Sequence, residues 1–354
     1  MKKRLLILVA VLATIFPASS QGIVFEELTF QEALDKAAAS GKLLFVDCYT
    51  EWCGPCKRLA GQVFTQEDVG AFFNEHFINL RVDMEKDEGP TLARRYAVHL
   101  YPTLLVIRPD GKEQHRIIGF RDAAALIERA QEGCDAERSL ASLEAAHNSG
   151  NREAGTITRY VLTLLDVLEN EKAARVADDL FASLADEEKT NPVLWPLYAN
   201  VALSPWGSSR FEFLRLHKRT FDRQQGKATV DSLFHEITTN LLAKIEKDDR
   251  LVIARLPGYI ETLRGMEFEQ RENILAEARF MLAFTRGKIG KAFRLYREHG
   301  EEFSAKGIKR RIQTMLEHEE FFRNHPSSVK LVKLIKSKKN KRQAPVAMRD
   351  PALL

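Results

Sequence analysis

Residues Phe45 to Lys57 read "FVDCYTEWCGPCK". The apolar run "KLLFVDCYT" has the length and composition of a buried β-strand. Two cysteines, Cys53 and Cys56, follow directly, with Pro55 between them. Such a pair can form a metal site, a structural crosslink or a redox centre, and the rest of the sequence discriminates among these.

The cysteine and histidine pattern argues against a metal site. Structural zinc usually needs four ligands, often from two close cysteine pairs. The other cysteines, Cys48 and Cys134, form no second pair, and the nine histidines show no metal-binding spacing. A permanent crosslink across so short a loop would remove little entropy from the unfolded chain. We therefore expect no metal and interpret the pair as a redox centre.

The predicted position of the pair supplies a mechanism. At the N-terminus of a helix, free backbone N–H groups and the positive dipole end favour the Cys53 thiolate. The thiolate is the nucleophile of disulfide exchange. Cys56 lies one turn later on the same side, where it can attack a mixed disulfide and release the product. The only redox group that this chemistry needs is the Cys53–Cys56 disulfide, so no cofactor is expected.

Helix and strand signals alternate on both sides of the pair. Thr29 and Glu32 form a capping-box pattern that begins a helix, which Gly41 ends. The elements expected after the pair are a strand at 77–83, a short helix at 92–99, two strands within 103–120 around the Pro109–Gly111 turn, and a helix ending near Cys134. We therefore predict an α/β domain over residues 21–134.

Residues 135–338 show helical periodicity without strand signals. Ala276–Tyr296 looks like a tetratricopeptide helix pair with its turn at Gly287, but no clean 34-residue period is present. A degenerate helical repeat and a single irregular helical domain both remain open. Breaks between helices are expected at 148–150, 204–207, 256–258 and 325–326. Residues 339–354 are predicted to be a basic, disordered tail.

The N-terminus resembles an export signal. Lys2, Lys3 and Arg4 precede an apolar run, and small residues stand before an expected cleavage after Ser20. A retained N-terminal anchor is the alternative. The formal net charge of +4 falls to +1 once these three cations are removed. Seven Lys or Arg lie in residues 329–342. This segment is either a solvated helix end and tail or a contact for an anionic membrane surface or an acidic partner. An exported chain meets no nucleic acid.

Two landmarks together resemble the thioredoxin superfamily over about residues 23–133. "FVDCYTEWCGPCK" resembles its active-site segment, and "LYPTLLVI", from Leu100 to Ile107, resembles its cis-proline loop. The resemblance implies the thioredoxin fold, a central mixed sheet flanked by helices. The predicted fold class is therefore α/β, followed by an all-α, repeat-like domain.

The resemblance also implies roles for individual residues. Cys53 corresponds to the exposed nucleophile and Cys56 to the resolving cysteine. Asp47 corresponds to the buried aspartate that relays the proton of the resolving thiol. Burial without a partner would raise its pKa toward neutrality. The alternative for Asp47 is a merely tolerated polar residue in a strand.

In the family, the cis-proline loop pairs with the substrate backbone, and a tryptophan shields the disulfide. Tyr101 is bulkier than the usual residue before the cis-proline, so it should reshape the substrate groove. The residues that the resemblance places at the substrate are Trp52, Gly54, Pro55, Tyr101, Pro102 and Thr103.

Three positions depart from the family pattern. Gly61 replaces a common helix-kinking proline. Cys48 stands where a large apolar residue is usual, as either a core side chain or an accessory thiol. A Cys48–Cys134 bridge is a further alternative.

The leading functional hypothesis is an exported thiol–disulfide oxidoreductase of the bacterial envelope, most simply periplasmic. Gly-Pro between the cysteines resembles reducing members of the family. The expected partners are protein disulfides and a membrane-embedded thiol electron donor. The alternative is a helical-repeat binding scaffold in which the α/β domain is accessory. A chaperone with a vestigial redox site is a third hypothesis.

Overall fold

The computed structural model describes residues 21–245, 248–300 and 303. The predicted signal peptide, the break at 325–326 and the basic tail lie outside these residues. The chain divides into two compact units, with the division between Ser183 and Leu184. In the part that the structure describes, no helix combines the length and apolar character needed to cross a membrane.

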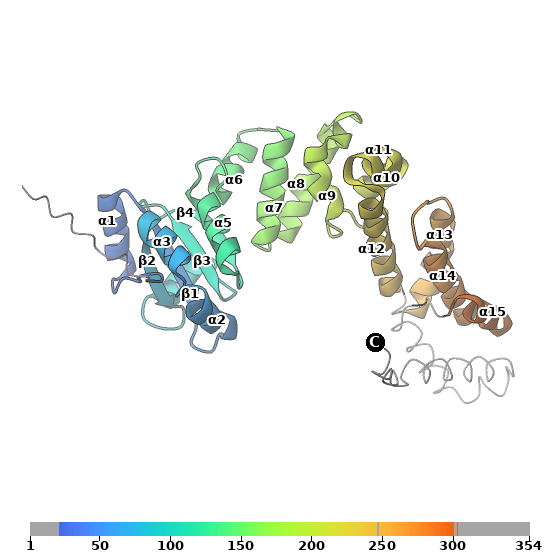
Figure 1. The fold of residues 1–354 in the computed structure, drawn as a ribbon, viewed down its shortest axis with the longest axis horizontal. Helices are drawn as coiled ribbons and strands as arrows, with labels where there is room; N and C mark the ends of the chain where they lie inside the picture. The colour runs from blue at the N-terminus through green and yellow to red at the C-terminus, as the bar shows by residue number, and fades with distance from the viewer. Residues whose placement is uncertain (1–20, 246–247, 301–302, 304–354) are drawn as a thin grey trace, which may run out of the picture. The chain divides into compact units, whose positions relative to one another are not determined.

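The first unit contains the mixed sheet that the sequence predicts (Figure 1). Its strand order is β2-β1-β3-β4, with β1 parallel to β2 and antiparallel to β3, which in turn runs antiparallel to β4. The strands are β1 Leu43–Tyr49, β2 Phe77–Asp83, β3 Thr103–Ile107 and β4 Glu113–Ile118. The central strands β1 and β3 are almost entirely buried, which explains their continuous apolar sequences.

Helices cover both faces of this sheet. They are α1 Phe30–Ser40, α2 Gly54–Gln62, α3 Glu67–His76, α4 Gly89–Arg95 and α5 Ala123–Cys134. One apolar cluster joins α1 and α4 to Leu44, Val46 and Cys48 of β1. The other joins α2, α3 and α5 to Phe45 of the same strand. The alternation of β1 side chains thus separates two cores.

Most of the predicted local signals in this region are confirmed. Thr29 and Glu32 form the capping box of α1, and Gly41 ends that helix with φ 66°. The hairpin turn contains Gly111 with φ 76°. The helix expected at 92–99 instead spans Gly89–Arg95. It begins earlier because Pro90 is well suited to a first turn, and Ala97 with φ 48° is incompatible with a helix extending to residue 99.

Three further helices belong to the first unit: α6 Leu140–Asn148, α7 Ala154–Asp166 and α8 Asn170–Ser183. The compact unit therefore continues beyond the end of the α/β alternation at Cys134. His115 of β4 explains part of this, because its Nδ1 accepts a hydrogen bond from the Leu140 backbone N–H at 3.1 Å. Arg129 of α5 also pairs with Asp166 of α7 at 2.9 Å.

The described part of the second unit is helical. Its elements are the short turns η1 Glu188–Thr190 and η2 Pro192–Leu194, and the helices α9 Trp195–Ala199, α10 Ser209–Leu216, α11 Lys218–Gln225, α12 Lys227–Ile245, α13 Asp249–Arg264, α14 Arg271–Thr285 and α15 Ile289–His299. Gly287 with φ 68° lies between α14 and α15, and Ala292 behind it is fully buried. The resemblance of this pair to a tetratricopeptide unit stays a prediction.

Two of the expected helix breaks are present, after Asn148 and around Pro205. The break expected at 256–258 is wrong, because α13 continues through Pro257. Proline removes one hydrogen bond of a helix, and burial of the same helix face can outweigh that loss. Leu256, Tyr259 and Leu263 are buried on α13 and supply that compensation.

Candidate active site

The two cysteines lie where β1 passes into α2. Cys53 is the N-cap residue of α2, and its sulfur accepts a hydrogen bond from the Cys56 backbone N–H at 3.1 Å. The two cysteines form a disulfide. Since the first backbone N–H groups of a helix have no partner within it, this position stabilises a thiolate on Cys53 when the disulfide is reduced. The geometry is that of a redox-active pair.

The disulfide is covered. Cys53 is 2% exposed and Cys56 is 1% exposed. The prediction of an exposed nucleophile is therefore wrong for the disulfide form, in which both cysteines pack into the start of the helix. Gly54 between them faces open space, since an added Cβ would meet no atom within 4 Å. Pro55 occupies the first turn of α2, where the missing N–H costs nothing.

The Tyr101–Pro102 peptide bond is cis, as the sequence resemblance implies. The Pro102 carbonyl accepts a hydrogen bond from the Gly119 backbone N–H at 2.9 Å. Thr103 begins β3 and is buried, and its hydroxyl donates to the Leu100 carbonyl at 2.8 Å. These contacts fix the loop at the end of the sheet.

Trp52 connects this loop to the cysteine pair. Its ring lies edge-on to the Tyr101 ring, with centroids 6.0 Å apart. Its Nε1–H donates to Oε1 of Glu85 at 3.0 Å, yet the side chain stays 67% exposed. Trp52, which directly precedes Cys53, and Tyr101 thus form an aromatic platform, with Trp52 open to solvent. Of the residues predicted at the substrate, Trp52 and Tyr101 are in direct contact.

Asp47 lies on the α2 face of the sheet, because it follows Phe45 by two residues in β1. It is 1% exposed. The expectation that it has no partner is wrong, since its Oδ2 accepts a hydrogen bond from Arg81 Nε at 3.0 Å. Burial raises the pKa of Asp47 to about 6, although the positive charge of Arg81 opposes this shift. Its Oδ1 is buried without a hydrogen-bond partner in the described structure.

Arg81 is a site residue that the sequence reasoning missed. It lies in β2 directly opposite Asp47 in the parallel register, and its guanidinium stacks on the Tyr49 ring at 4.2 Å. The only local signal is that Arg81 is the one cation in the strand "FINLRVD". That signal could not identify Asp47 as the partner, because the register between strands is a tertiary property.

A charged flank borders the aromatic platform. Glu85 accepts the hydrogen bond from Trp52. The adjacent Lys86 forms ion pairs with Glu51 and Asp83. These contacts tie the loop after β2 to the turn that carries the cysteines. Glu85 and Lys86 were also missed by sequence reasoning, since nothing local marks them as neighbours of Trp52.

Cys48 and Cys134 are free thiols. Cys48 belongs to the core on the α1 face, whereas Cys134 packs against the core on the α2 face, so the sheet separates them. Burial raises the pKa of Cys48 well above its usual range, and burial raises the pKa of Cys134 to about 11. Neither forms the bridge that the sequence left open, and Cys48 fits the core alternative.

Comparison with known proteins agrees with this geometry. The profile of the Thioredoxin-like family matches residues 26–109. A thioredoxin from Chlamydia trachomatis is 38% identical over 101 residues, which cover 28% of this chain and 91% of the relative. The thiol:disulfide interchange protein DsbD of Pseudomonas fluorescens is 38% identical over 102 residues, but these are 18% of its length.

A solved structure of a candidate disulphide-isomerase from Bacteroides thetaiotaomicron is 50% identical, with a TM-score of 0.31. The matched region covers 33% of the present chain and 98% of the solved chain. The family profile lies within the first third of the sequence. The assignment rests on the sequence relatives together with the disulfide at the start of α2 and the cis-proline loop. The chain belongs to the thioredoxin-like family and carries that family's thiol–disulfide oxidoreductase site.

Proposed function

We propose that this protein is an exported thiol–disulfide oxidoreductase of the bacterial envelope that reduces protein disulfides. The observation that carries the proposal is the Cys53–Cys56 disulfide at the N-terminus of α2, joined to the cis-proline loop by the contact between Trp52 and Tyr101. The pattern of residues 1–20 supports export.

In the reducing direction, the Cys53 thiolate attacks one sulfur of a substrate disulfide. The substrate S–S bond breaks, one substrate thiolate leaves, and a mixed disulfide with Cys53 forms. The Cys56 thiol then loses its proton, for which Asp47 is the proposed acceptor, and attacks the Cys53 sulfur. The second substrate thiolate leaves, and the Cys53–Cys56 disulfide is formed. Two electrons have passed from the dithiol to the substrate.

Each turnover leaves the disulfide form, so a thiol donor must reduce it again. In an oxidising compartment, we propose a membrane-embedded thiol protein as this donor. Trp52, Tyr101 and Pro102 are the proposed substrate contacts, with Gly54, Pro55 and Thr103 shaping the backbone around them. In this proposal, an extended substrate segment lies along the cis-proline loop and places its disulfide at Cys53.

Insulin reduction with dithiothreitol as the donor tests the mechanism. We expect Cys53→Ser to abolish turnover, and Cys56→Ser to accumulate mixed disulfides that non-reducing gels reveal. Cys48→Ala is the matched control, because Cys48 faces the other core, and should turn over normally. Full activity in Cys53→Ser would contradict the proposal.

The direction of the reaction is tested by the reduction potential of the pair in glutathione buffers. A potential near about −270 mV, as in reducing thioredoxins, supports a reductase. A potential near about −120 mV indicates an enzyme that inserts disulfides. The alternative function, a helical binding scaffold with an accessory redox domain, is favoured by one feature of the second unit, its grooves.

A further inference from the structure

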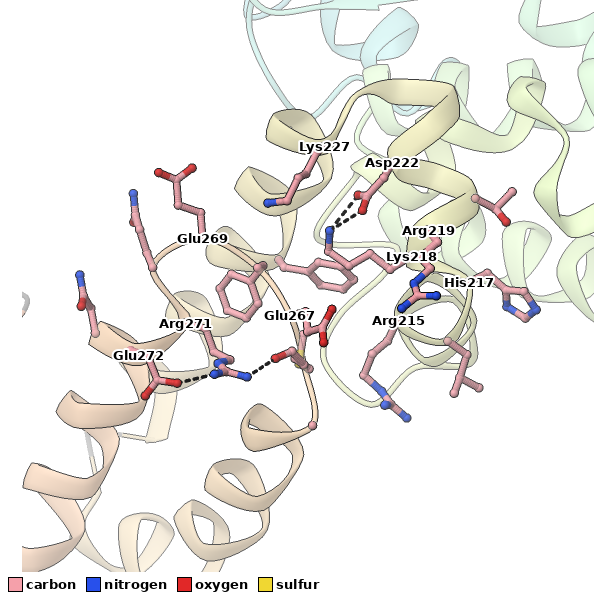
Figure 2. Close-up of a pocket in the computed structure, with 18 residues that line it drawn as sticks. Arg215, His217, Lys218, Arg219, Asp222, Lys227, Glu267, Glu269, Arg271 and Glu272 are labelled. Carbon is pink, nitrogen blue, oxygen red and sulfur yellow. Dashed lines mark hydrogen bonds and ion pairs between the residues drawn. The ribbon is translucent and has the colours of Figure 1, made fainter.

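Two grooves in the described part of the second unit differ in character. The larger, with a volume of about 1060 Å³, lies between the α10–α11 region and the segment leading into α14. Figure 2 shows that several of its charges are already paired, with Lys218 on Asp222 and Arg271 on Glu272. Lys218 and Lys227 also pair with the buried Asp231. The larger groove therefore contains charges of both signs and favours neither an anionic nor a cationic ligand.

The smaller groove, of about 240 Å³, lies between α13 and α14 at the start of α15. We call it the α13–α14 groove, and its lining residues are Pro257, Ile260, Glu261, Arg264, Arg279, Leu282, Ala283, Arg286, Lys288 and Lys291. Its apolar lining consists of Ile260 and Ala283, which are buried, and of Pro257 and Leu282, which reach solvent. Its rim is almost entirely cationic.

The cations of this rim are not neutralised by the described part of the chain. Five of the lining residues are Arg or Lys and one is a carboxylate, Glu261. Glu261 pairs with Arg264 at 2.6 Å. Within the described residues, no carboxylate lies within 4.0 Å of the other four cations, Arg279, Arg286, Lys288 and Lys291. Cations that line one groove create a positive potential there, which attracts an anion.

The spacing of the lining residues indicates which kind of anion fits the groove. Arg279, Leu282 and Arg286 recur at three- and four-residue intervals, which places two cations on one helix face around an apolar position. Lys288 and Lys291 extend the positive charge past the end of α14. A small inorganic anion would use the charges but leave the apolar surface of Pro257 and Leu282 in water. A peptide segment with carboxylates on either side of an apolar side chain uses both.

We propose that the α13–α14 groove binds an acidic segment of a partner protein, with glutamates or aspartates on the cationic rim and an apolar residue against Pro257 and Leu282. The site lies on the unit that does not carry the disulfide. It would recruit a partner independently of the direction of the redox reaction, and its test does not depend on the activity of Cys53.

Fluorescence anisotropy of the full chain tests the proposal. The probe is a labelled peptide of Glu with Leu at every third position, and the control probe carries Lys in place of Glu. The test variant is Arg279→Glu with Lys291→Glu. The matched variant, Arg219→Glu with Arg255→Glu, makes the same change of net charge at two exposed positions outside this groove. Circular dichroism melts establish that both variants fold.

We expect the acidic peptide to bind the wild type, with affinity that falls as salt rises. The test variant should lose about tenfold or more, and the matched variant less than about twofold, because two attractive charges become repulsive only in the former. Equal losses in both variants would mean that net charge alone binds the peptide, and would overturn the proposal. Binding of anionic phosphatidylglycerol vesicles without binding of the peptide would overturn it too, since the occupant would then be a lipid surface.

Discussion

Arg81 donates a hydrogen bond from Nε to Oδ2 of Asp47 at 3.0 Å, and the two residues face each other across the parallel strands β1 and β2. Asp47 is almost completely buried, whereas the Arg81 side chain is 35% exposed. The pair therefore links a buried carboxylate on the α2 face of the sheet to the solvent side of the sheet edge. Two of the predictions below follow from this asymmetry.

The first prediction concerns the proton acceptor. In Arg81→Leu, loss of the opposing charge should raise the pKa of Asp47 further above about 6, by roughly one unit. The acid limb of the pH–rate profile for insulin reduction should shift upward by the same amount. Arg81→Lys is the control, because it retains the charge and should restore most of the wild-type profile. An unchanged profile in Arg81→Leu would show that Asp47 does not titrate in the rate-limiting step.

The second prediction concerns stability. The pKa of Asp47 is about 6 in the folded protein against an ordinary 3.8, so the folded state binds more protons between these pH values. The contribution of this group to the free energy of unfolding falls as pH rises through that window. Above pH 6 the buried, charged carboxylate destabilises the folded state. Asp47→Asn should therefore raise the free energy of unfolding at pH 7 by about 1–3 kcal/mol.

The gain from Asp47→Asn should disappear near pH 4, where the wild-type carboxyl is protonated in the folded state. Arg81 tolerates the loss of its partner because its side chain reaches solvent. Urea unfolding of the oxidised proteins at pH 4 and pH 7 measures the difference. A variant that is less stable than the wild type at pH 7 would show that the ion pair outweighs the cost of burial.

The third prediction concerns His115, which is buried and accepts a hydrogen bond from the Leu140 N–H. Burial, assisted by the positive charge of Arg129, lowers the pKa of His115 from 6.5 to about 4. The unfolded chain therefore binds more protons between these values, and stability is lost as pH falls from about 6.5 to about 4. The loss can reach about 3 kcal/mol.

His115→Asn removes this titration and retains a hydrogen-bond acceptor. Its unfolding free energy should depend less on pH between 6.5 and 4 than that of the wild type. The control is His99→Asn, which changes an exposed residue. If the wild type and His115→Asn show parallel pH dependence in urea unfolding, the pKa of His115 does not differ between the folded and unfolded states.

The fourth prediction concerns the aromatic platform. Tyr101→Ala removes the edge-on contact with Trp52, which is worth about 0.5–1.5 kcal/mol for aromatic pairs. We expect KM for insulin to rise about two- to tenfold while kcat changes little, because the cysteines are untouched. Tyr101→Phe keeps the ring and should behave as the wild type. A fall in kcat without a change in KM would place Tyr101 in the chemistry rather than in substrate binding.

The sequence alone determined the features that depend on short segments. An apolar run specified β1, a capping box and Gly41 bounded α1, and Pro109–Gly111 specified the hairpin turn. The spacing of Cys53 and Cys56 specified the pair at the start of a helix, and the resemblance around Tyr101 and Pro102 specified a cis bond. Each is encoded within a few residues, because backbone hydrogen bonding and side-chain periodicity are local.

The tertiary structure alone decided which distant residues meet. It paired Asp47 with Arg81, covered Cys53, continued α13 through Pro257, and joined α6 to β4 through His115. Asp47 and Arg81 are 34 residues apart, and a one-residue shift between β1 and β2 would turn Arg81 to the other face. Strand register and packing depend on the whole core, so the partner that sets the charge state of the buried aspartate could be read only from the folded chain.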